Sequence, residues 1–100
     1  MTEHPIVCTL SPADLRQRRD QLLPGLIERA ESRDPIAGGI RLRFAASSEV
    51  MGEILRMIDA ERQCCRFLRF HFIVEPDLGP LWLEVTGPAG TAEFLSEFLR

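Results

Sequence analysis

The chain has 100 residues of which 45% are hydrophobic, which suffices for one compact domain with a single core and not for two. Its 12 basic and 15 acidic residues leave a net charge of -3, so we expect neither nucleic acid nor an anionic membrane among its partners. No apolar run approaches the roughly 20 residues that cross a bilayer, and the N-terminus lacks the features of a secretory signal, so we expect a cytoplasmic protein.

The first half of the chain predicts two strands and a helix between them. Residues 5–10 have the composition of a short strand, and residues 11–14 (SPAD) predict a helix start, with a capping serine followed by a proline. The helix meets Pro24, which should kink or split it, and it should end before the Asp34-Pro35 pair. Alternating apolar and basic residues over 40–45 then predict a strand with one buried face.

The second half of the chain predicts a long helix, a hairpin and a short helix. Ser47 or Ser48 should cap a helix that reaches roughly to Cys65. The later elements are two alternating strands joined by a turn and a final helix, over residues 69–75, 81–86 and 91–99. The order β-α-β-α-β-β-α predicts an α+β fold, with helices on one face of a mixed or mainly antiparallel four-stranded sheet.

The segment ERQCCRF, residues 61–67, stands at the end of the long predicted helix. At about 100° per residue, Glu61 falls at the centre of the apolar stripe of that helix. Cys64 and Cys65 follow it at i+3 and i+4 and therefore flank it. A carboxylate on an apolar face is costly unless it is protonated, paired or bound to a cation, so Glu61 needs a partner.

Two kinds of partner for Glu61 are open. One is an arginine, Arg19 or Arg66, with the cysteines acting as small core residues. The other is a soft or borderline metal ion such as Zn(II), Cu(I) or Hg(II), bound by Cys64 and Cys65, with Glu61 as a ligand or a nearby base. Because adjacent helical residues diverge by about 100°, both thiols reach one ion only if the helix ends there or a second chain supplies ligands.

The remaining cysteine and the two histidines are weaker candidates. Cys8 alternates with apolar neighbours and is either a small buried residue or a third thiol of the site. Two adjacent cysteines close only a strained ring, so we expect reduced thiols. His4 is near the terminus, and His71 should lie on the strand face away from the cysteines, so neither gives a catalytic Cys–His pair. A thiol-dependent enzyme is therefore the last of the hypotheses.

The sheet face opposite the helices should carry a mixed group of residues, which are Arg41, Arg43, His71, Ile73, Trp82 and Glu84. No predicted element remains to cover this face. It is either an ordinary surface with a few apolar groups or an association surface, most simply of a homodimer that packs sheet to sheet through Trp82.

Two motifs carry a resemblance to a group of small bacterial proteins. These have an E-R-x-C-C-P-F segment before a strand and a G-P-x-W-L-x-x-T-G-P segment before the last helix, similar to residues 61–67 and 79–88 here. The group is associated with heavy-metal and particularly mercury resistance. The resemblance implies that Glu61, Cys64 and Cys65 act together, with Cys8 as a further thiol. Arg66 replaces the proline of the motif, so the exposure of Cys65 need not follow the group.

These observations give two hypotheses. The first is a small cytoplasmic thiol protein that binds a soft metal ion through Cys64, Cys65, Glu61 and Cys8. The second is a dimeric interaction module in which the cysteines are structural and the sheet face around Trp82 binds the partner.

Overall fold

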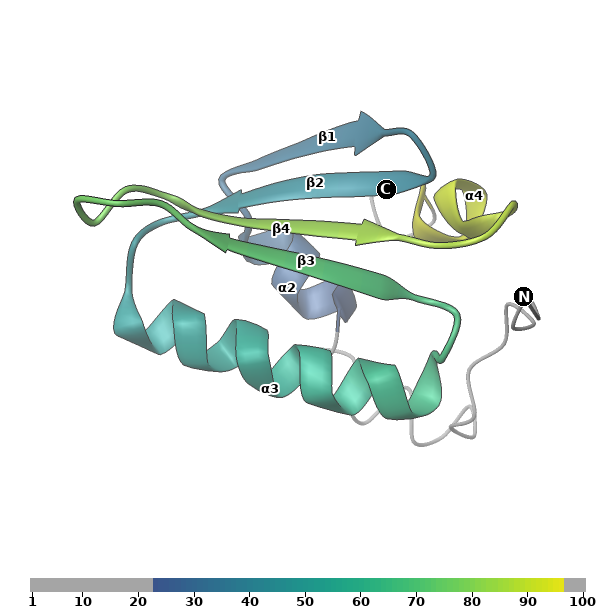
Figure 1. Cartoon of the computed structure of the whole chain (residues 1–100), viewed down its shortest axis with the longest axis horizontal. Coiled ribbons are helices and arrows are strands. Elements are labelled where there is room, and N and C mark those ends of the chain that lie inside the picture. Colours follow the sequence, from purple (N-terminus) through teal and green to yellow (C-terminus); the bar gives the residue numbers. More distant parts are fainter. Residues whose placement is uncertain (1–22, 97–100) are drawn as a thin grey trace.

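The structure, a computed structural model, describes residues 23–96 (Figure 1). Its elements in chain order are α2 (Leu23–Arg29), β1 (Ser32–Ile36), β2 (Gly39–Phe44), α3 (Ser48–Cys64), β3 (Arg69–Val74), β4 (Leu81–Thr86) and α4 (Thr91–Ser96). The four strands form one antiparallel sheet in the order β1-β2-β4-β3. The predicted α+β fold is confirmed, whereas the strand at 5–10 and the helix start at 11–14 lie outside the described residues.

Strand β1 is an element that the sequence analysis missed. The DPIAGG segment, residues 34–39, has the proline and glycines of a turn or loop. In the structure it forms a hairpin in which Ile36 pairs with Gly39. Gly38 has a φ of +77°, a value that a residue without Cβ adopts at little cost. Pro35 is tolerated because β1 is an edge strand, where one side of the backbone needs no ladder hydrogen bond.

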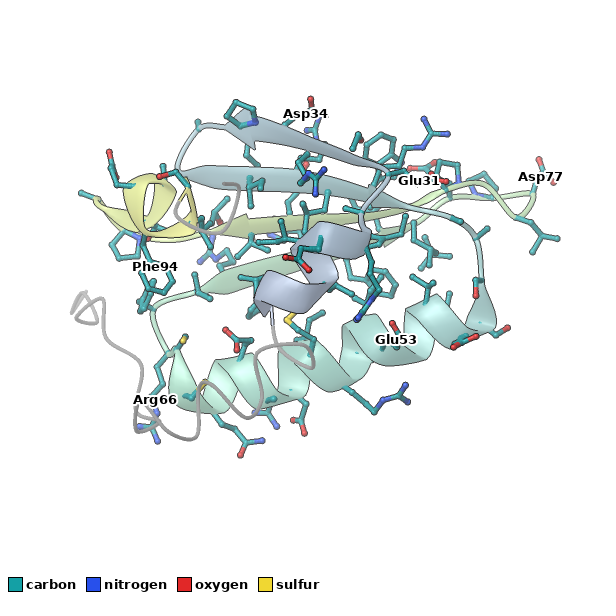
Figure 2. The ribbon with its side chains drawn as sticks, turned by 180° about the vertical axis from the view of Figure 1, so that it is seen from behind. Glu31, Asp34, Glu53, Arg66, Asp77 and Phe94 are labelled. Atoms are coloured by element: carbon teal, nitrogen blue, oxygen red, sulfur yellow. The ribbon has the colours of Figure 1, made fainter. Side chains whose placement is uncertain are left out.

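The core lies between the sheet and the helices. Strands β2 and β4 bury every second side chain on one face, and these are Ile40, Leu42, Phe44, Leu81, Leu83 and Val85. The helices α2 and α3 contribute Leu23, Leu26, Ile27, Ile54 and Met57 to the same cluster. Seen from behind, α2 lies in front of the sheet, and α3 runs along its lower edge (Figure 2). The period-two alternation of the sequence therefore sets which face the helices cover.

Helix α3 begins and ends near the predicted residues. The Ser47 hydroxyl accepts a hydrogen bond from the Val50 amide at 3.2 Å, which settles the choice between the two capping serines. The last helical residue is Cys64, and Cys65 caps the helix with a φ of -114° and a ψ of 73°. The backbone therefore leaves the helical path at the second cysteine.

The C-terminal elements agree with the prediction as far as they are described. Strands β3 and β4 form the predicted hairpin, whose tip holds Asp77 and Leu78 at positive φ. Helix α4 lies at the end of the sheet where α3 also ends (Figure 1), and residues 97–100 lie outside the described part. None of the helices within residues 23–96 is long and apolar enough to cross a membrane.

Candidate metal centre

Three side chains that can bind a metal converge at the C-terminal end of α3. The Cys64 Sγ atom lies 3.9 Å from Glu61 Oε1 and 3.8 Å from Cys65 Sγ. One ligand atom from each of the three residues lies within 4.8 Å of the others. The residues are only 4%, 4% and 3% exposed in chain order, so the group is part of the core and not of the surface.

The end of the helix brings the two adjacent thiols together. In a continuing helix, the side chains of Cys64 and Cys65 would point about 100° apart. Here Cys65 has left the helical conformation, while its amide still donates a hydrogen bond to the Glu61 carbonyl at 2.6 Å. This change of backbone direction lets both sulfurs face the same space. The condition that the sequence analysis set for a shared ion, a helix that ends at the cysteine pair, is met.

The turn after Cys65 is buried in the core. Phe67 and Leu68 are buried, and the Leu68 amide donates to the Cys65 carbonyl at 3.1 Å. The Phe67 ring packs edge to face against Phe94 of α4, with 5.3 Å between ring centroids. Arg66 lies at the end of α3 with its side chain directed outward, and Phe94 projects from α4 nearby (Figure 2). The thiols are thus kept away from bulk water, which strengthens any charge interaction among them.

Burial dominates the electrostatics of Glu61. Removal of the carboxylate from water raises its pKa above the ordinary value, because the charged form is the one that burial disfavours. Hydrogen bonds from the Cys65 and Cys64 thiols oppose this effect and lower the pKa, since a donor stabilises the carboxylate. The net direction is upward, so the pocket favours either a protonated acid or a compensating cation beside Glu61.

The arginine alternative finds no support within residues 23–96. No ion pair in this part of the chain includes Glu61, and Arg66 is exposed. The nearest arginine on the same helix, Arg62, pairs with Asp59 at 2.7 Å on the outer surface. Arg19 lies outside the described residues. Among the described residues, the hydrogen-bond partners of Glu61 are the two thiols.

The other candidates of the sequence analysis lie elsewhere. Cys8 and His4 are outside the described residues. His71 lies on the open face of the sheet, with Nδ1 3.8 Å from Glu84 Oε1, and so points away from the cysteines as the alternation predicted. The structure also buries Phe67, which lies three residues after the end of α3 and contacts Phe94. The signal that could have found Phe67 is an apolar residue just after a helix end, a position that often packs back on the last turn.

Comparisons with protein families, with curated proteins and with solved structures find no match for this chain. Its function is therefore inferred from the site itself.

Proposed function

We propose that this protein binds one soft or borderline metal ion per chain through Cys64, Cys65 and Glu61. The observation that supports this function most is the convergence of two sulfurs and a carboxylate oxygen within 4.8 Å in a buried pocket. Paired thiolates select soft or borderline ions, and a carboxylate is a known third ligand of zinc. A cation would also compensate the buried charge of Glu61.

The spacing of the donors suits a tetrahedral ion. With a zinc–sulfur bond of about 2.3 Å and a tetrahedral angle, two thiolates on one ion lie about 3.8 Å apart. The sulfurs of Cys64 and Cys65 lie 3.8 Å apart, so they would have to move little on binding. A linear two-coordinate ion would need about twice the bond length, roughly 4.6 Å at the same bond distance. Among the candidate ions, this favours Zn(II), or Cu(I) with more than two ligands, over a linear Hg(II) site.

Burial favours retention of the ion over rapid transfer. Because Glu61 and both thiols are buried, an ion reaches them only when part of the fold opens. We therefore infer a role in storing or sequestering a soft or borderline ion. A fourth ligand would come from water or from Cys8, the third thiol of the chain.

The test is native mass spectrometry of the freshly reduced protein, alone and with Zn(II), Cu(I) or Hg(II). We expect one ion per chain for wild type and none for the Cys64→Ser/Cys65→Ser variant, because a hydroxyl is a poor ligand for a soft ion. Glu61→Gln should bind more weakly and not lose binding altogether. Cys8→Ser shows whether the third thiol contributes, by a lower affinity.

The contrary outcome is equally clear. Unchanged stoichiometry in the Cys64→Ser/Cys65→Ser variant would place the ion elsewhere and refute the site. If wild type binds none of the three ions, the proposed function is wrong and the cysteines serve only to pack the core. Circular dichroism of each variant separates loss of ligands from loss of fold.

A further inference from the structure

The open face of the sheet has a regular pattern of charge. The strand register aligns Asp34, Arg41, Glu84 and His71 in one row across all four strands, which we call the charged row. Ser32, Arg43, Trp82 and Ile73 form the adjacent row, called here the tryptophan row. No helix within residues 23–96 covers these rows, since α2 and α3 pack on the other face.

Contacts within each row hold the side chains in place. The Arg41 guanidinium lies 2.9 Å and 2.8 Å from Glu84 Oε2 through Nε and Nη2. In the tryptophan row the Arg43 guanidinium lies over the Trp82 ring, 5.7 Å from its centroid, beside Ile73, which is 39% exposed. The face thus presents a fixed arrangement of charges with an exposed apolar neighbour.

Along the charged row, Asp34 is negative, Arg41 is positive and Glu84 is negative, and His71 ends the row. Reversal of the row therefore places Arg41 and Glu84 opposite their complementary charges. A two-fold axis parallel to the strands, running between β2 and β4, performs this reversal for a second copy stacked on the open face. Arg41 then faces the second copy's Glu84, and Asp34 faces its His71.

We propose that the open face is a homodimer interface with this two-fold axis. The same operation sets Arg43 of one copy against Trp82 of the other, so the cation–π pairing within each chain extends across the interface. Two such sheets stack with their strands roughly aligned, which is a common packing of sheet on sheet. A second copy of this chain is the partner that the reversed row fits, because isologous contacts need a self-complementary surface.

The pattern also excludes the other simple arrangement. A two-fold axis across the strands, along the charged row, would set Arg41 against the second copy's Arg41 and Glu84 against its Glu84. Like charges held opposite each other oppose association. The charge order therefore selects one orientation of the two sheets and not merely the face.

The size of the face sets the strength of the dimer. Four strands about 4.8 Å apart and about six residues long cover roughly 19 by 20 Å in projection. This footprint lies below the roughly 800 Å² per partner of a standard stable interface. We therefore expect a reversible dimer whose population rises with protein concentration.

The first experiment is sedimentation velocity over a concentration series at low ionic strength. Wild type should move from monomer toward dimer, and Trp82→Glu should stay monomeric over the same range. Leu55→Glu is the matched control, because Leu55 is 51% exposed on α3 and outside the face, so this variant should dimerise like wild type. A monomeric wild type at every concentration, or a Trp82→Glu variant that dimerises as wild type does, would overturn the interface.

The second experiment tests the axis with a charge swap. The Arg41→Glu/Glu84→Arg variant keeps one positive and one negative charge at positions 41 and 84. Two swapped chains therefore still pair opposite charges within each chain and across the interface, so this variant should dimerise. A mixed dimer would oppose two arginines and two glutamates. Because the swap leaves the mass unchanged, ¹⁵N-labelled wild type is mixed with the unlabelled variant and examined by native mass spectrometry.

We expect the two homodimers and almost no mixed dimer. The control is a mixture of labelled and unlabelled wild type. It should give the statistical share of mixed dimer. A statistical share with the swapped variant as well would overturn the proposed axis.

Discussion

Glu61 is the residue around which the site is organised, because it is a carboxyl group in a place that suits an apolar side chain. It lies on the buried stripe of α3 with Ile54 and Met57, and its hydrogen-bond partners are thiols. A thiol is a weak donor and compensates little of the cost of burying a charge. The cost is a reason to expect that the residue serves a purpose other than packing.

Replacement of Glu61 by glutamine should change the pH dependence of stability. The pKa of Glu61 in the fold is raised above its ordinary value of 4.5, so the fold favours the protonated acid. Its contribution to stability is fully present below about pH 4.5 and is lost as the pH rises through the folded-state pKa. The free energy of unfolding of the ion-free wild type should therefore fall relative to that of Glu61→Gln between pH 4.5 and 7.

Urea denaturation of the two proteins, reduced and treated with a chelator, measures this difference. The range stops at pH 7 so that the thiols, whose ordinary pKa is about 8.5, contribute little. Parallel curves for the two proteins would show that burial does not perturb Glu61.

At the scale of elements, the end of α3 makes the site. If the helix continued by one residue, the two sulfurs would diverge and the donor set would separate. The helix ends here although no proline follows the cysteine pair, since residue 66 is an arginine. Phe67 and Leu68 are buried, and Phe67 packs against Phe94 of α4. Burial of these two side chains favours a turn of the backbone after Cys65. Tertiary packing thus accounts for a helix end that has no proline.

A proline at position 66 should therefore be tolerated. Because Cys65 already has a non-helical conformation, Arg66→Pro should change the free energy of unfolding by about 1 kcal/mol or less. Gln63→Pro is the control, since it places proline within α3 and should cost about 3 kcal/mol or more. Equal losses for the two variants in urea denaturation would mean that helical geometry continues past Cys65.

At the scale of the whole molecule, the sheet separates two surfaces. Its covered face and the helices hold the candidate metal centre, and its open face carries the charged and tryptophan rows. The two proposed functions, metal binding and self-association, thus belong to different sides of the sheet. A variant of one surface should leave the other intact, so the two proposals can be tested separately.

Metal binding should stabilise the whole fold, because the ligands come together only in the folded chain. An ion at 100 times its dissociation constant should add about 2.7 kcal/mol to the free energy of unfolding. The gain should shrink as the pH falls from 8 to 6, since thiolates bind the ion and protons compete for the sulfurs. Thermal unfolding with and without Zn(II) at each pH measures this gain in stability.

The Cys64→Ser/Cys65→Ser variant is the control in that experiment and should show no gain at any pH. A gain in wild type that does not vary with pH would contradict thiolate ligation.

Much of the fold could be predicted from local patterns, and the exception has a physical cause. Alternation identified β2, β3 and β4, and the capping serine and apolar stripe identified α3. Strand β1 was missed because Asp34 and Pro35 are poor strand residues by themselves. They form a strand since β2 offers a pairing partner and the edge position tolerates proline. Pairing with a distant or adjacent strand is not a property of the segment alone.

The sequence by itself determined which residues are at the site, because helical periodicity puts Glu61 on the apolar stripe with Cys64 and Cys65 one turn later. Only the tertiary structure decided that both sulfurs face one space, since this depends on where α3 ends and on the packing of Phe67 against Phe94. The charge pattern of the open face has the same division. Alternation set the face of each residue. The strand order and register decided that the charged side chains line up in one row across the four strands. Periodicity is local, but contacts between distant segments are fixed by the packing of the whole chain.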